Sequence, residues 1–165
     1  MRSSASYLRS VTTFTHAEGM VDVSSKVVSK REAHASCSII LPKRIVDAIF
    51  SPCGTVNQKG NIIHTARLAG ISGSKKTADL IPLCHQVPLS HVSVDFTRDG
   101  PERIRVTGSA KCVNQTGVEM EALTAVSISA LTVYDMSKSA LKGSSDKIII
   151  TDIQLDSKSV NDTAS

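Results

Sequence analysis

Residues 117–142 read GVEMEALTAVSISALTVYDMSKSALK, and this segment sets the architecture of the chain. It contains no proline, and its only glycine is the first residue. Its apolar side chains recur at helical spacing, which predicts one helix from about residue 118 to residue 142. Much of its surface carries little side chain, so a neighbouring element can pack closely against the small residues Ala122, Ala125, Ser127, Ser129 and Ala130.

Charged side chains occur only near the two ends of this predicted helix. Glu119 and Glu121 lie in the first turn, where acidic groups complement the helix dipole. Asp135 lies in the C-terminal half, where a negative charge opposes the helix dipole, so complementarity with the dipole does not explain its position. Asp135 and Lys138 are three residues apart and share a face, so they form either a solvated surface pair or a general acid–base pair.

The distance between the two charged ends limits what one helix can do. Glu121 and Asp135 are fourteen residues apart, which places them on nearly the same side of a helix but roughly 21 Å from each other. One helix cannot bring both carboxylates to the same reacting atom. We therefore expect that they contact opposite ends of a long ligand, or that a second copy of the chain brings them together.

Length and composition indicate a single globular domain. The chain has 165 residues, of which 41% are hydrophobic and 21% charged, so it can form its core without disulfides. No apolar run reaches the length of a membrane span, and we expect no membrane association. The net charge of +4 favours an anionic partner of unspecified class. The chain has four cysteines, namely Cys37, Cys53, Cys84 and Cys112. They lack zinc-ligand spacing, so we expect reduced thiols, three of them in the core.

The two termini differ in composition from the rest of the chain. Residues 1–17 contain Arg2, Arg9, many Ser and Thr and no acidic residue. This composition suits an organellar transit peptide, and equally a disordered tail or a linker from a larger polypeptide. The first case predicts the mitochondrial matrix, and the others the cytoplasm. We expect the folded domain at residues 18–159 and a flexible tail at 160–165.

Between the termini, predicted strands alternate with predicted helices. Val92, Val94 and Phe96 alternate with polar residues, as do the apolar residues of 104–112, and the turn between them predicts a β-hairpin. Periodicity, prolines and glycines predict an extended segment at 20–24, strands at 34–41 and 147–155, and helices at 42–50, 60–73 and 75–81. This order predicts an α+β fold, a ferredoxin-like antiparallel four-stranded sheet with helices packed on one face.

Three motifs resemble those of one known family. The chain resembles the MoaC family, the cyclic pyranopterin monophosphate synthases of molybdenum cofactor biosynthesis, at residues 79–85 (DLIPLCH), 117–125 (GVEMEALTA) and 134–138 (YDMSK). The first motif contains His85 in a loop that two prolines restrict, although a histidine in such a loop is as often only hydrogen-bonded. The resemblance covers about residues 16–159, which would then form the catalytic domain.

The resemblance implies a lyase that converts 3′,8-cyclo-7,8-dihydroguanosine 5′-triphosphate into cyclic pyranopterin monophosphate and releases pyrophosphate. A radical-SAM GTP cyclase, the functional partner of the family, is expected to supply this GTP-derived substrate. The resemblance also implies a homohexamer, a trimer of dimers, with active sites at subunit interfaces. No protein-bound metal, cofactor or nucleic acid is implied.

The motif match assigns a role to each site residue. Asp135 and Lys138 match the catalytic aspartate and lysine, and Lys59 and Lys158 match further lysines of the family site. Residues 159–164 read SVNDTA where the family usually has SGGKSG, which puts the placement of Lys158 by a C-terminal loop in doubt. The match places substrate binding on Leu83, Cys84, His85, Glu119, Met120 and Glu121.

These residue types suit the implied reaction. A buried Asp135 beside Lys138 is expected to transfer protons while the ring opens and closes. Glu119 and Glu121 can accept hydrogen bonds from a guanine-like edge, and Cys84 is expected to contribute packing rather than a nucleophile. Five cations could bind the triphosphate, namely Lys59, Arg67, Lys75, Lys76 and Lys158. A solvated basic surface explains Arg67, Lys75 and Lys76 equally well.

Two alternatives belong to other classes of protein. A basic ferredoxin-like RNA-binding domain would need stacking aromatics on its sheet, and the predicted strands offer only Phe96. A family member without catalysis would act as an assembly or regulatory subunit. The altered residues 159–164 allow that interpretation. Four retained site residues argue against it, namely Asp135, Lys138, His85 and Lys59.

Overall fold

The computed structural model describes residues 19–162. Four strands form one antiparallel sheet in the order β2-β3-β1-β4. The strands are β1 (Ser29–Ile40), β2 (Leu89–Arg98), β3 (Arg103–Asn114) and β4 (Ile149–Asp162). The helices are α1 (Lys43–Ile49), α2 (Ile62–Ser74), α3 (Thr77–Leu80) and α4 (Glu119–Ser137), which continues into the 3-10 helix η1 (Lys138–Leu141).

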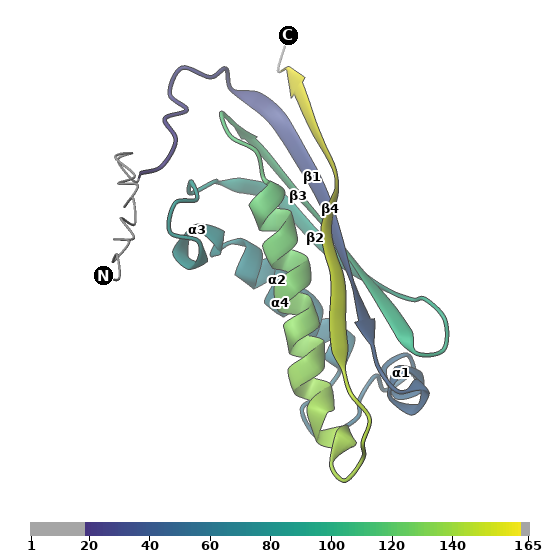
Figure 1. Ribbon diagram of the computed structural model, residues 1–165. Coiled ribbons are helices and arrows are strands. Elements are labelled where there is room, and N and C mark those ends of the chain that lie inside the picture. Colours follow the sequence, from purple (N-terminus) through teal and green to yellow (C-terminus); the bar gives the residue numbers. More distant parts are fainter. Residues whose placement is uncertain (1–18, 163–165) are drawn as a thin grey trace, which may run out of the picture.

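The long helix α4 and its neighbour α2 cover one face of the sheet, and α1 lies at the end of β1 (Figure 1). This arrangement confirms the predicted α+β fold with an antiparallel four-stranded sheet. The strand order is compatible with the ferredoxin-like plan. Within the described residues no helix is both long and apolar enough to cross a membrane.

The core lies between the sheet and the helix layer, and the central strand β1 contributes several side chains to it. Alternate residues of this central strand, Ala33, Ala35, Cys37 and Ile39, are at most 1% exposed. The Cys37 thiol donates to the main-chain oxygen of Val126 on α4, at 3.6 Å. With no tryptophan in the chain, the core is filled by small and branched aliphatic side chains.

The helices α2 and α4 approach each other closely, as the small residues of α4 predict. The Ser129 hydroxyl donates to the main-chain oxygen of Ala66 at 3.1 Å. Gly70 of α2 lies directly on α4, because a β-carbon there would be 2.6 Å from the main-chain oxygen of Ala125. Close packing therefore depends on residues that lack a large side chain on both helices.

Several predicted boundaries are wrong. The segment predicted to be extended at 20–24 belongs to no strand: residues 20–23 have no regular secondary structure and a turn begins at Ser24, whose amide donates a hydrogen bond to the Asp22 carboxylate at 2.9 Å. The helix predicted to reach residue 142 ends at Ser137, and the next four residues are 3-10. Strand β4 reaches Asp162, beyond the predicted end at residue 155, because Ser29–His34 of β1 pair with its polar end.

The cysteines are reduced, but only two of them are buried. Cys37 and Cys112 lie in the core, Cys84 is partly exposed, and Cys53 is exposed in the loop before α2. The prediction of three core cysteines is therefore wrong. Hydrogen bonding from Ser51, with help from Thr55, lowers the pKa of the Cys53 thiol to about 7.

Candidate functional site

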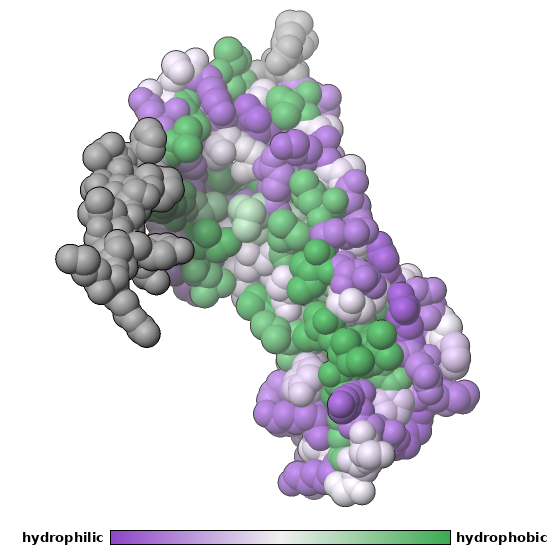
Figure 2. All heavy atoms as spheres, viewed as in Figure 1, coloured by the Kyte–Doolittle hydropathy of each residue, from purple (hydrophilic) through white to green (hydrophobic). Residues whose placement is uncertain are grey.

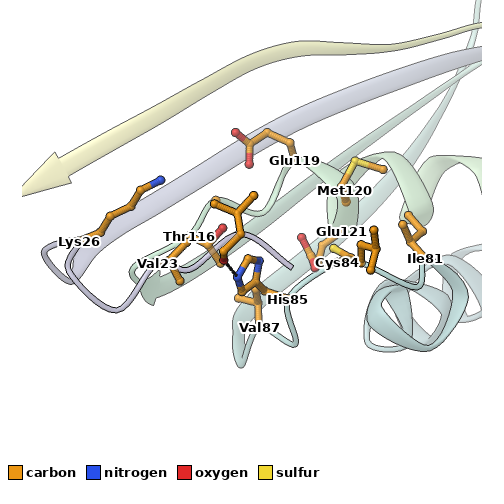
Figure 3. A pocket seen from close by; sticks show the side chains of 13 residues that line it. Val23, Lys26, Ile81, Cys84, His85, Val87, Thr116, Glu119, Met120 and Glu121 are labelled. Atoms are coloured by element: carbon orange, nitrogen blue, oxygen red, sulfur yellow. Dashed lines mark hydrogen bonds between the residues drawn. The ribbon is translucent and has the colours of Figure 1, made fainter. Parts of the chain in front are cut away.

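A cavity of about 450 Å³ opens beside the first turn of α4. It lies between that turn, the loop that follows α3 and the segment that precedes β1 (Figure 3). Its volume is in the range of small-molecule sites. Six of the predicted site residues line it, namely Leu83, Cys84, His85, Glu119, Met120 and Glu121.

Glu121 is the most buried acid of the cavity, with only 3% of its surface exposed. Burial raises the pKa of the carboxyl above its usual range, and the neighbouring charge of Glu119 adds to the effect. Burial and the charge of Glu121 likewise raise the pKa of the Cys84 thiol. A thiol of this kind is a poor nucleophile, which agrees with the packing role expected of Cys84.

Glu119 forms an ion pair with Lys158, whose ammonium lies 2.9 Å from the carboxylate. Burial alone would raise the pKa of Glu119, but the hydrogen bond and charge of Lys158 outweigh it and the pKa is lowered. Lys158 belongs to strand β4 and pairs with Ala33 of β1, so the expected C-terminal loop is absent at this position. Strand pairing, and not a glycine-rich tail, positions the lysine here.

His85 contacts the chain that precedes β1. Its Nε2 atom lies 2.7 Å from the main-chain oxygen of Val21 (dashed line in Figure 3). The loop that carries His85 therefore holds the N-terminal segment at the cavity. In this conformation the ring is hydrogen-bonded to the chain itself.

Asp135 lies at the other end of α4, between two lysines. Its two carboxylate oxygens are 2.6 Å from the ammonium of Lys138 and 2.7 Å from that of Lys59. Hydrogen bonds from Lys138 and then Lys59 lower the pKa of Asp135 to about 2, and the Asp135 carboxylate raises the pKa of Lys138. The expectation of a buried Asp135 is wrong, because 50% of its side chain is exposed.

The site residues therefore form two groups at opposite ends of one helix. Glu121 and Asp135 both belong to α4, so their separation of fourteen residues corresponds to roughly 21 Å along the helix axis. The structure thus confirms that a single helix carries both acids. Each group is open to solvent on one side in the single chain.

Comparison with known proteins identifies the family. The model of the MoaC family matches residues 20–160. The chain belongs to the MoaC family. It is similar to "Cyclic pyranopterin monophosphate synthase, mitochondrial" of Arabidopsis thaliana, with 50% identity over 143 residues, 84% of this chain and 49% of that protein.

Bacterial MoaC-family relatives match over more of their length. The "Cyclic pyranopterin monophosphate synthase" of Desulforapulum autotrophicum is 48% identical over 154 residues, 90% of each chain. The protein of the same name from Staphylococcus epidermidis is 42% identical over 158 residues, 90% of this chain and 93% of that protein. The chain thus spans about half the length of the plant relative and nearly all of the bacterial ones.

Three of the five candidate phosphate-binding cations of this MoaC-family chain lie away from the cavity. Arg67 donates to the main-chain oxygen of Val94 and lies 5.9 Å from the centre of the Phe96 ring, so it belongs to the sheet and not to the cavity. Lys76 pairs loosely with Asp79. Lys75 lines a different cavity beside β2.

Sequence reasoning missed two features of the site. It assigned Lys59 to the site without predicting its contact with Asp135, because the two residues are 76 positions apart. It also overlooked Lys26, which lines the cavity and lies two residues after the segment predicted to be extended at 20–24. In residues 19–162 no three His, Cys, Asp or Glu side chains are grouped so as to hold a metal ion.

Proposed function

We propose that this chain is a cyclic pyranopterin monophosphate synthase of molybdenum cofactor biosynthesis. It converts 3′,8-cyclo-7,8-dihydroguanosine 5′-triphosphate into cyclic pyranopterin monophosphate and releases pyrophosphate. The observation that carries the proposal is the gathering of the motif-matched residues into two compact groups at the ends of α4. Similarity to relatives that bear this name supports the same activity.

The cavity end of α4 suits recognition of the guanine-derived ring. Glu119 and Glu121 present carboxylate oxygens that accept hydrogen bonds from ring N–H groups. The raised pKa of Glu121 reflects the cost of holding a charge in a largely buried position. A ligand that donates hydrogen bonds to this carboxylate offsets part of that cost, so binding and recognition are coupled.

The Asp135 end of α4 supplies the proton chemistry. With a pKa of about 2, Asp135 is ionised at neutral pH, so it acts as a hydrogen-bond acceptor and orients the two ammonium groups. Lys138 is charged and can bind a developing negative charge or donate a proton, although the Asp135 carboxylate raises its pKa and so holds that proton more tightly. Lys59 adds a second cation at the same carboxylate.

The two groups act on one substrate only if a second subunit joins them. Along α4 an exposed apolar stripe faces away from the sheet, with Met120, Leu131 and Tyr134 39%, 56% and 41% exposed, and apolar surface follows this part of the molecule (Figure 2). Residue 128 lies midway between Glu121 and Asp135. An antiparallel, two-fold contact of α4 with its copy near residue 128 therefore brings Glu121 opposite Asp135 of the partner subunit.

We infer the homohexamer, a trimer of dimers, as the assembly that contains this contact. The catalytic domain comprises residues 18–159, and a radical-SAM GTP cyclase supplies its substrate. The proposed mitochondrial location depends on residues 1–17, which lie outside the described residues. It is supported by the name of the Arabidopsis relative, which includes the word "mitochondrial".

A coupled assay tests the function. The radical-SAM cyclase generates the cyclic intermediate from GTP, the protein is added, and cyclic pyranopterin monophosphate and pyrophosphate are quantified. The expected result is stoichiometric formation of both products by the wild-type chain and none by Asp135→Asn. An intermediate that stays bound and unconverted would instead indicate the non-catalytic family member.

A further inference from the structure

The segment at residues 19–28, here called the strap, runs along the cavity before β1 begins. Val21, Val23 and Lys26 of the strap line the cavity (Figure 3). Most of the strap lacks helix or strand structure. Two hydrogen bonds connect main-chain oxygens of the strap to side chains of the domain: His85 Nε2 lies 2.7 Å from the Val21 oxygen, and the Gln115 side-chain amide donates to the Ser24 oxygen at 3.2 Å.

Lys26 gives the cavity a charged group opposite its acids. It is the one Lys or Arg among the described residues that line the cavity. Figure 3 shows Lys26 at one end and Glu121 at the other, with His85 between them. Among residues 19–162, no carboxylate forms an ion pair with Lys26, whereas Lys158 is already paired with Glu119.

This polarity restricts how a ligand can lie in the cavity. An anionic group is repelled by the Glu121 carboxylate, less so by Glu119 because Lys158 offsets its charge, and is attracted to the ammonium of Lys26. An N–H-rich ring edge has the opposite preference, because carboxylates are hydrogen-bond acceptors. A molecule with such an edge at one end and phosphate at the other therefore fits in a single orientation.

We propose that the strap closes over the bound ligand, with Lys26 contacting a phosphate and Gln115 serving as the positioning residue that latches the strap. The identity of the ligand as a guanosine-derived triphosphate rests on the proposed function. The contact between Lys26 and a phosphate does not rest on the proposed function, because it is argued from the charges of the residues that line the cavity. Inorganic triphosphate is therefore a suitable probe, since it carries the phosphate chemistry without the ring.

Calorimetric titration of the full chain with inorganic triphosphate tests the role of Lys26. A charge-assisted contact predicts that Lys26→Ala weakens binding by about tenfold or more and that Lys26→Arg recovers most of the loss. The matched control is Lys30→Ala, an exposed lysine that lines a different cavity, and it should stay within about twofold of wild type. Unchanged affinity in Lys26→Ala, or no binding of triphosphate by the wild-type chain, overturns the proposal.

Tryptic cleavage after Lys26 reports on the latch. Gln115→Ala should speed this cut, and triphosphate should slow it in the wild-type chain, whereas the matched control Gln154→Ala should be cut at the wild-type rate. Equal rates for Gln115→Ala and wild type would remove Gln115 from the proposal. If the chain shows no turnover while triphosphate binding and tryptic cleavage follow these expectations, the result counts against the proposed function and not against the strap.

Discussion

At the scale of single residues, the charge on Asp135 is fixed by its two lysines. Its pKa of about 2 keeps the carboxylate ionised at neutral pH. Because the folded-state pKa is depressed, the ion pairs contribute to stability above the ordinary value of 3.8, and this contribution is lost as the pH falls through about 2. Catalysis above pH 4 should therefore be insensitive to titration of this group.

Asp135→Asn isolates that charge, because the amide keeps the shape of the side chain. We expect turnover to fall by about 10²-fold or more, while the melting temperature changes by no more than about 2 °C, since exposed ion pairs add little to stability. Single-turnover product formation and calorimetry measure the two quantities. Near wild-type turnover would remove Asp135 from the catalytic group.

Glu121 allows a prediction about pH and stability. Its pKa is raised in the folded chain, so the fold is destabilised once the pH exceeds the unfolded value, and this cost is absent in acid, where the carboxyl is protonated in both states. Glu121→Gln should therefore melt at a higher temperature than wild type at pH 8, with the difference vanishing below pH 4. Glu102→Gln, an exposed control, should follow wild type at both pH values.

The residues that sequence reasoning could place are those with short-range or motif signals. The i,i+3 spacing of Asp135 and Lys138 predicted a shared face, and the contact is present at 2.6 Å. Lys59 meets the same carboxylate across 76 residues of chain, and no local pattern encodes such a contact. The exposure of Asp135 was also unpredictable, because it depends on which elements cover the end of α4.

At the scale of elements, the contact between α2 and α4 sets the position of both site groups. A β-carbon at Gly70 would meet the main-chain oxygen of Ala125 at 2.6 Å, whereas one at Gly73 would meet only the side chain of Ile128, at 2.8 Å. Main-chain atoms cannot rotate away, so Gly70→Ala should lower the free energy of unfolding by about 1–3 kcal/mol and Gly73→Ala by less. Urea denaturation ranks the variants, and the reverse order would contradict the packing argument.

The extent of β4 shows where element prediction from sequence stops. Residues 157–162 are polar except for Val160 and lack the apolar alternation that marks a half-buried strand. They are nevertheless paired, because the start of β1 runs antiparallel beside them and hydrogen-bonds to their main chain. Tertiary pairing therefore overrides the local signal, and it also brings Lys158 to Glu119.

At the scale of the whole molecule, the exposed stripe of α4 predicts an interface. Leu131 is 56% exposed in the single chain, so a charge there should be harmless to a monomer and costly in a buried contact. We expect Leu131→Glu to remain folded by circular dichroism while it dissociates the oligomer and loses turnover, and Leu131→Ala to retain both. A monodisperse wild-type monomer in light scattering would eliminate the interface.

Sites shared between subunits also predict complementation between two inactive variants. If Glu121 of one subunit acts with Asp135 of the partner subunit, a dimer of Glu121→Ala with Asp135→Asn has one site with both substitutions and one with neither. Random pairing after equal co-expression makes half of the dimers mixed, so about a quarter of wild-type turnover should return. Sites built within one chain would give no recovery of turnover, because every chain carries one of the two substitutions. In that case the two ends of α4 would have to contact opposite ends of one long ligand.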